Sequence, residues 1–154
     1  MARSRQAGRH RRVREAATPR YAPAPTAAVA GVLYDSDIVI DILRGREAVV
    51  NAARDLEAAG VPTFCTAITW AEIFAGLRPG EEPVTRAFFE ARGEVVLEAA
   101  TGERAGAYMA RYARSHGVEL ADALIAAAAA SAGLSLWTRN RRHYPMPDLK
   151  FYTP

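Results

Sequence analysis

The sequence predicts an α/β domain in which helices cover both faces of a central parallel β-sheet. Short apolar segments alternate along the chain with longer segments that have helical periodicity, and Gly or Pro often separates them. Strands that alternate with helices in this way favour a parallel sheet. The chain has 154 residues and is 50% hydrophobic, which suits one domain with a single core.

The positions of apolar residues and breakers set the expected order of elements. Strands are predicted at 31–34, 61–66, 94–97, 134–137 and 150–153, and helices at 38–44, 46–59, 69–77, 82–92, 101–116 and 120–132. Thr69 with Glu72 three residues later matches a capping box, so Thr69 is expected to open the third helix. Residues 138–147 are predicted to form a loop.

The basic charge of the chain lies in its leading segment. Residues 1–30 contain seven Arg and one Glu, whereas the other 124 residues carry 13 basic and 16 acidic side chains. We expect residues 1–28 to form a flexible basic arm rich in Arg and Pro, and residues 29–154 to form the folded domain. Such an arm can bind phosphate backbones without reading their sequence, or can be a plain disordered extension.

Several features favour a soluble, cytoplasmic protein. The single cysteine, Cys65, lies in an apolar segment and cannot form an internal disulfide, so we expect a buried structural thiol. Prolines and an Arg interrupt the leading segment, which is therefore not a convincing signal peptide. The apolar segment 121–134 contains Asp122 and is too short to span a bilayer.

Acidic residues follow the predicted strands at positions where ligands bind in parallel sheets. Asp35 and Asp37 come directly after the first strand, and Glu72 lies near the start of the helix after the second. Asp122 is an acid within an otherwise apolar helix, where a lone carboxylate is costly unless it is paired or binds a metal. Each has a structural alternative, since Asp35 and Asp122 can cap helices and Glu72 can complete the capping box.

The loop after the fourth strand adds further candidates. Thr138 and Asn140 are positioned to orient a water molecule or a ligand. The three arginines of this loop can hold phosphate groups, or can simply be solvated: Arg139, Arg141 and Arg142. Oxygen ligands without a Cys or His cluster favour Mg²⁺ or Mn²⁺ over zinc, and such a site suits phosphodiester chemistry.

Four segments together resemble the VapC branch of the PIN-domain ribonucleases. The first is Leu33-Tyr34-Asp35-Ser36-Asp37 followed by the apolar residues up to Leu43-Arg44-Gly45. The others are the segments that begin at Thr69, Asp122 and Leu136, the last running through Arg139-Asn140-Arg141-Arg142-His143-Tyr144. The resemblance covers about residues 32–154, in order and with plausible spacing.

The resemblance implies a three-layer PIN-like domain and metal-assisted hydrolysis of RNA. It implies that Asp35, Glu72 and Asp122 bind Mg²⁺ or Mn²⁺ and that Asn140 stands at the family's fourth acidic position. Ser36, Asp37 and Thr138 are expected to support these residues, and Arg139, Arg141 and Arg142 to contact RNA. It further implies a toxin that is neutralised by a VapB-type antitoxin, forms a homodimer, and binds operator DNA through the antitoxin complex.

Two other functions fit parts of the sequence. A non-catalytic nucleic-acid-binding module would use the basic arm and would not need Asp35. A phosphatase of the haloacid dehalogenase type would use Asp35-Ser36-Asp37-Ile38-Val39, with Asp35 as the nucleophile and Asp37 as the general acid. That chemistry also requires a downstream Lys, and the one Lys of the chain is Lys150.

Overall fold

The computed structural model describes residues 31–154, so the arm predicted for residues 1–28 lies outside the described residues. Five parallel strands form one sheet in the order β3-β2-β1-β4-β5. The strands are β1 (Val32–Tyr34), β2 (Thr63–Thr66), β3 (Gly93–Val95), β4 (Ser135–Trp137) and β5 (Lys150–Phe151). The predicted parallel sheet is confirmed.

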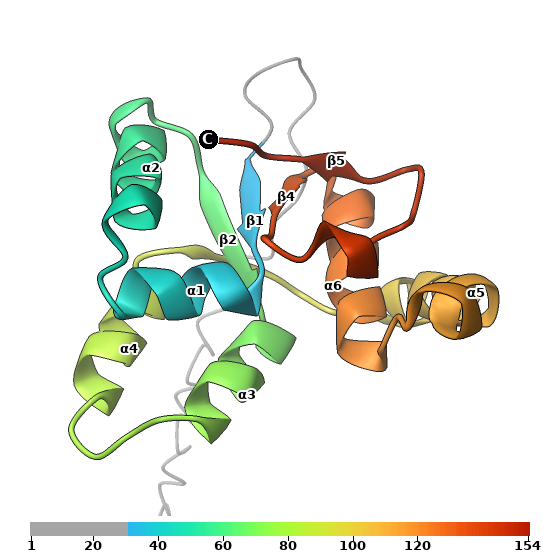
Figure 1. The fold of residues 1–154 in the computed structure, drawn as a ribbon, viewed down its shortest axis with the longest axis horizontal. Coiled ribbons are helices and arrows are strands. Elements are labelled where there is room, and N and C mark those ends of the chain that lie inside the picture. The colour runs from blue at the N-terminus through green and yellow to red at the C-terminus, as the bar shows by residue number, and fades with distance from the viewer. Residues whose placement is uncertain (1–30) are drawn as a thin grey trace, which may run out of the picture.

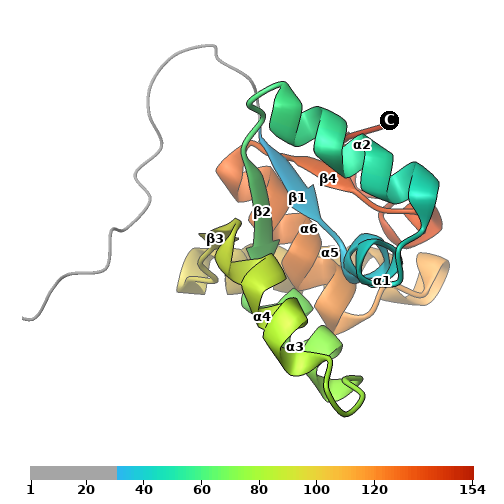
Figure 2. The same cartoon turned by 90° about the vertical axis from the view of Figure 1, so that its left-hand side faces the viewer.

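Helices cover both faces of the sheet, as Figures 1 and 2 show. They are α1 (Ser36–Leu43), α2 (Glu47–Ala58), α3 (Ala67–Ala75), α4 (Glu82–Glu90), α5 (Ala99–His116) and α6 (Leu120–Ala132). α1, α2 and α4 lie on one side of the sheet, and α5 and α6 lie on the other. α3 lies beyond the carboxyl end of β2 and packs against both halves of the core. This is the three-layer arrangement that the alternation of strands and helices predicts.

Alternating side chains of β1 divide the core into two halves. Val32 and Tyr34 are buried against α1 and α2, while Leu33 is buried on the opposite face against α6. Successive residues of a strand point to opposite faces, so a strand with both faces covered is apolar throughout. In β4, Leu136 and Trp137 divide between the two halves in the same way.

Helix α6 is buried on most of its surface because alanine allows close approach. Ala126, Ala127, Ala128 and Ala129 are all fully buried between the sheet and α5. A helix that is apolar on nearly all sides belongs in a protein interior. The first turn of α6, which carries Asp122, is thereby held near the sheet.

The order of the strands reverses between β1 and β4. The chain first builds β1, β2 and β3 in one direction, and then crosses to add β4 and β5 on the other side of β1. Ligands of open parallel sheets bind at such a switch point, outside the carboxyl ends of the strands. Tyr34 and Trp137 are paired at the ends of β1 and β4, so the residues that follow them emerge side by side.

Three helices begin earlier than the sequence predicts, the first of them α1, which begins at Ser36 rather than at residue 38. Thr66, not Thr69, is the N-cap of α3, because its hydroxyl oxygen accepts a hydrogen bond from the backbone N–H of Thr69 at 3.3 Å. The predicted capping box of Thr69 and Glu72 is therefore wrong, and Glu72 lies in the second turn of α3. Helix α5 likewise begins at Ala99 rather than at Thr101.

Cys65 is a buried residue of β2, as predicted. Burial raises the pKa of its thiol to about 12, which Arg92 only partly opposes. The thiol is therefore protonated at neutral pH and does not act as a nucleophile.

Among the described residues, no helix is long and apolar enough to cross a membrane.

Candidate active site

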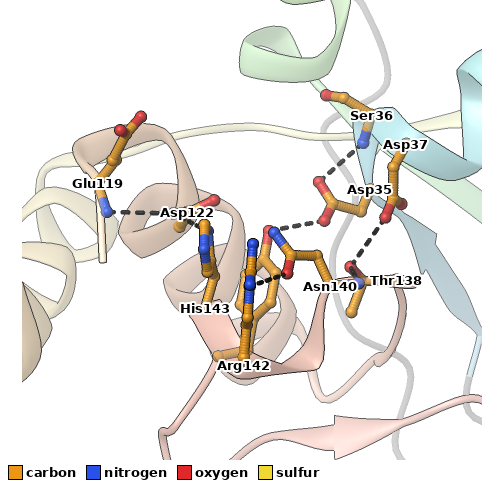
Figure 3. Close-up of polar contacts among 10 residues, drawn as sticks. Asp35, Ser36, Asp37, Glu119, Asp122, Thr138, Asn140, Arg142 and His143 are labelled. Carbon is orange, nitrogen blue, oxygen red and sulfur yellow. Dashed lines mark hydrogen bonds and ion pairs between the residues drawn. The ribbon is translucent and has the colours of Figure 1, made fainter. Parts of the chain in front are cut away.

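Asp35 lies at the switch point and is held by three hydrogen bonds, of which Figure 3 shows the two of its side chain. Its backbone N–H donates to the carbonyl oxygen of Trp137 at 3.0 Å, which continues the pairing of β1 with β4. Its Oδ1 accepts from the backbone N–H of Ser36 at 2.8 Å, and its Oδ2 accepts from the hydroxyl of Tyr144 at 2.9 Å. Asp35 is thus the N-cap of α1 and is also a buried acid, 8% exposed, at the edge where ligands bind.

Asp37 lies in the first turn of α1 and is held by the loop after β4. Its Oδ2 accepts from the backbone N–H of Arg139 at 2.9 Å and from the hydroxyl of Thr138 at 3.5 Å. Its Oδ1 is buried and accepts no hydrogen bond of ordinary geometry within the described part of the chain. An oxygen of this kind is costly to bury unless a ligand or an ion completes its environment.

The electrostatics of these two acids reflect burial and mutual repulsion. Burial raises the pKa of Asp35, and hydrogen bonding with Thr138, Tyr144 and Ser36 opposes this effect. The charge of Asp122 adds a smaller contribution that raises the pKa further. Burial and the charge of Asp35 raise the pKa of Asp37 to about 6, against hydrogen bonding from Arg139. Carboxylates with raised pKa values at a sheet edge are candidates for a functional site.

Asp122 approaches the same edge from α6. Its Oδ2 accepts from the backbone N–H of Glu119 at 3.1 Å, and Nδ1 of His143 lies 3.4 Å from the same oxygen. Glu119, not Asp122, is the N-cap of α6, and Asp122 completes a capping box with it while its side chain remains 21% exposed. The capping contact involves one carboxylate oxygen and leaves the other available.

Tyr144 adds a buried hydroxyl to this edge, hydrogen-bonded to Asp35. Burial raises the pKa of its hydroxyl far above the usual range, and the charges of Asp35, Asp122 and Asp37 raise it further. The hydroxyl therefore stays protonated and acts as a donor. Sequence reasoning did not select Tyr144 as a site residue; the signal was an aromatic hydroxyl in the loop after β4, because a buried Tyr needs a hydrogen-bond partner.

Glu72 stands apart from this group. It is exposed, and its Oε2 accepts a short hydrogen bond from the hydroxyl of Ser36. It also lines an apolar groove of about 370 Å³ between α1 and the α3–α4 hairpin, whose wall includes Ile40, Leu43 and Val84. Ser36 therefore connects Glu72 to the acidic edge without bringing it against Asp35.

The loop after β4 is fixed largely by contacts within the protein. Asn140 donates its backbone N–H to the hydroxyl of Thr138 at 3.0 Å, and its side-chain oxygen accepts from Nε of Arg142 at 3.0 Å (Figure 3). The guanidinium of Arg139 forms a short ion pair with Asp41. That of Arg141 donates to the hydroxyl of Thr153 at 2.5 Å.

The donor set suits a hard divalent cation. All the acids at this edge offer oxygen ligands, and one oxygen, Asp37 Oδ1, is buried without a hydrogen-bond partner among the described residues. Across residues 31–154, no three His, Cys, Asp or Glu side chains are already arranged as a complete set of metal ligands. Filling such a site would therefore require a rearrangement of side chains.

Lys150 is at the wrong end of the sheet for phosphatase chemistry at Asp35. It begins β5 and is paired with Ser135, the first residue of β4, so it lies at the amino edge of the parallel sheet. Asp35 follows the carboxyl end of β1, on the opposite edge. A lysine beside Asp35, which the haloacid dehalogenase type of mechanism requires, is therefore not supplied by Lys150.

Comparisons with known proteins agree with this architecture. A family profile described as the PIN domain matches residues 32–149. Ribonuclease VapC19 of Mycobacterium tuberculosis is 34% identical over 120 residues, which cover 77% of this chain and 96% of the relative. Ribonuclease VapC10 of the same organism is 37% identical over 121 residues, which cover 75% of this chain and 86% of the relative.

Solved structures show the same fold. One chain of a toxin–antitoxin complex from Klebsiella pneumoniae superimposes with a TM-score of 0.64 at 28% sequence identity. The match covers 77% of this chain and 95% of that one. The similarity therefore extends over nearly the whole of the domain described by residues 31–154.

Proposed function

The chain belongs to the PIN-domain family as a VapC-type member, and from this premise we propose that it is a metal-dependent endoribonuclease, the toxin of a toxin–antitoxin pair. The observation that carries the proposal is that Asp35, Asp37 and Asp122 lie at one edge of the sheet, at its switch point (Figure 3). The relatives named ribonucleases in the comparison support RNA as the substrate.

Asp35, Glu72 and Asp122 would hold Mg²⁺ or Mn²⁺ in this proposal. A bound divalent ion supplies an activated water and neutralises charge on the scissile phosphate. The unpartnered Oδ1 of Asp37 and the raised pKa values of Asp35 and Asp37 support a cation at this edge. Glu72 would join the set by exchanging its contact with Ser36.

The remaining residues would orient the substrate. Asp37 and Thr138 would hold the loop after β4 in place, and Asn140 would position a water molecule through its side-chain amide. Of the three loop arginines, Arg142 is the best placed to contact RNA phosphate, because its guanidinium is exposed and its partner, Asn140, lies in the same loop. The guanidinium of Arg139 is instead paired with Asp41 on α1, and that of Arg141 is bound to the last residues of the chain. Arg139 and Arg141 would help to bind RNA by holding the loop after β4 in place, through the internal contacts of their guanidinium groups.

The partner in this proposal is a VapB-type antitoxin. The Klebsiella neighbour was solved as a toxin–antitoxin complex, which supports a protein partner for this chain. We further propose, from the family resemblance, that the toxin forms a homodimer and that operator DNA binds through the antitoxin complex. Growth inhibition would then follow from RNA cleavage when the antitoxin is absent.

The decisive experiment compares the purified, antitoxin-free chain with Asp35→Asn on total cellular RNA, in Mg²⁺ and in excess chelator. Asn can still cap α1 but removes the charge, so the fold should persist. We expect cleavage to fall by at least about 100-fold, because the loss of a ligand exceeds the effect of losing an outer partner. Asp55→Ala, which removes an exposed carboxylate on α2, is the matched control and should cleave normally.

Two outcomes would contradict the proposal. Cleavage by folded Asp35→Asn at the wild-type rate would exclude Asp35 from the active site. Cleavage that persists in excess chelator would exclude a divalent ion. If the folded wild type cleaves nothing and binds RNA only when residues 1–28 are present, the non-catalytic binding module becomes the better description.

A further inference from the structure

The hydroxyl of Tyr144 is the feature of the acidic edge that the proposed metal set does not use. Tyr144 is 3% exposed, and its Oη donates to Oδ2 of Asp35 at 2.9 Å. A phenylalanine would fill the same space without a polar atom, and a buried hydroxyl is costly unless it is hydrogen-bonded. The contact with Asp35 therefore gives this hydroxyl a specific role.

Tyr144 is held rigidly enough to orient another side chain. Its backbone N–H donates to the carbonyl oxygen of Arg141 at 2.9 Å, which closes the short 3-10 helix of residues 141–143. Its ring is part of the buried cluster that contains Leu136, Met146 and Leu149. The position of Oη is thus fixed by the backbone on one side and by core packing on the other.

The geometry leaves Asp35 able to bind an ion. Oδ1 accepts from the backbone of Ser36 and Oδ2 accepts from Tyr144, so both carboxylate oxygens are fixed in direction. Each oxygen has two lone pairs, and one hydrogen bond occupies one of them. The carboxylate therefore keeps acceptor capacity on both oxygens while its plane is prevented from rotating.

We propose that Tyr144 is a positioning residue that orients the Asp35 carboxylate for a divalent cation. This inference rests on the proposed function, because it assumes that Asp35 is a metal ligand. Carboxylates that bind metals are themselves held by hydrogen bonds, and removal of such an outer partner typically costs about 10–100-fold in metal affinity. Tyr144→Phe should therefore weaken the affinity for Mn²⁺ by about 10–100-fold.

The chain offers a matched control for the loss of a hydroxyl. Tyr108 is another largely buried tyrosine of the same cluster, and its Oη donates to Oδ2 of Asp148 at 2.6 Å. Tyr108→Phe removes the same kind of contact, from a hydroxyl to a carboxylate, but away from Asp35. A general effect of losing such a contact would appear in both variants, and an effect on the metal site would appear in one.

The experiment titrates the full chain, Tyr144→Phe and Tyr108→Phe with Mn²⁺ by calorimetry, after their melting temperatures show that all are folded. We expect a weaker Mn²⁺ affinity for Tyr144→Phe and an unchanged one for Tyr108→Phe. RNA cleavage by Tyr144→Phe should need more Mn²⁺ for half-maximal rate, with the rate at saturating Mn²⁺ close to that of the wild type. A merely structural role would not move the metal requirement in this way.

The possible failures are distinguishable. Wild-type affinity in Tyr144→Phe, with Mn²⁺ bound normally by the wild type, would overturn the positioning role and leave the proposed function intact. An equal loss of affinity in Tyr108→Phe would also overturn it, because the effect would not be specific to Asp35. A wild-type chain that binds no Mn²⁺ would overturn the proposed function and this inference together.

Discussion

Asp37 and Asp41, which lie one turn apart on α1, differ in how their charge is balanced. Asp41 is 3% exposed, and both of its carboxylate oxygens face guanidinium groups. Nε of Arg46 lies 2.6 Å from Oδ1, and NH1 of Arg139 forms a short ion pair with Oδ2. Buried carboxylates are normally stabilised by partners of this kind.

Asp37 contacts the same neighbour, Arg139, in a different way. Arg139 offers Asp37 its backbone N–H, while its guanidinium is directed to Asp41. Asp37 also lies near a second carboxylate, Asp35, whose charge contributes to its raised pKa. The difference shows that α1 balances charge where the acid is structural and leaves it largely unbalanced at the sheet edge, where a cation would complete the site.

Asp41→Ala should produce the largest loss of stability among the changes that test this comparison. It removes both ion pairs, so we expect the free energy of unfolding to fall by about 2 kcal/mol, measured by urea denaturation at neutral pH. The value is below that of a fully buried pair because Arg46 and Arg139 have 57% and 56% exposed side chains. A loss no larger than that of Asp55→Ala would show that these ion pairs do not stabilise the fold.

Asp37→Asn should have the opposite sign in metal-free protein. The pKa of Asp37 is about 6 in the folded state, above its ordinary value of 3.8, so folding favours the protonated form. The contribution of Asp37 to the free energy of unfolding is therefore fully present below about pH 4, and it is lost as the pH rises through 6. Removing the charge should raise the free energy of unfolding at pH 7 by about 1 kcal/mol, after allowance for solvent screening of a partly exposed group.

The measurement is urea denaturation of both proteins in chelator at several pH values. The difference between Asp37→Asn and the wild type should be near zero at pH 4 and should grow between pH 4 and 6. Destabilisation by Asp37→Asn at pH 7 would show that the charged carboxylate is well accommodated without a cation, and the contrast with Asp41 would fail.

Local pattern was sufficient to predict the acid that lies at the switch point. Apolar strands, helix periodicity and breakers gave the order of elements, and an acid directly after a strand of a parallel sheet has a known position. The start of α3 was predicted incorrectly because Thr66 and Thr69 both fit the pattern of a cap. The choice between them depends on where β2 ends, which its pairing with β1 and β3 decides.

Contacts between distant residues could not be predicted in the same way. Arg139 and Asp41 are 98 residues apart, and Tyr144 and Asp35 are 109 residues apart. A loop rich in arginine predicts phosphate contacts equally for each arginine, because the sequence does not show which guanidinium already has an internal partner. In the structure, Arg142 contacts a residue of its own loop, whereas the guanidinium groups of Arg139 and Arg141 are bound to other parts of the fold.

Arg46→Ala is the smallest of these changes and tests whether the two ion pairs of Asp41 are equivalent. Arg46 is more than half exposed, and its removal leaves Asp41 paired with Arg139. We expect a loss of about 0.5 kcal/mol in the free energy of unfolding, which high salt should reduce further. RNA cleavage and Mn²⁺ affinity should stay at wild-type levels, since Arg46 contacts the structural acid and not the sheet edge. A loss as large as that of Asp41→Ala would instead mean that Arg46 alone balances the buried charge, and that the guanidinium of Arg139 is free to serve the acids around Asp37.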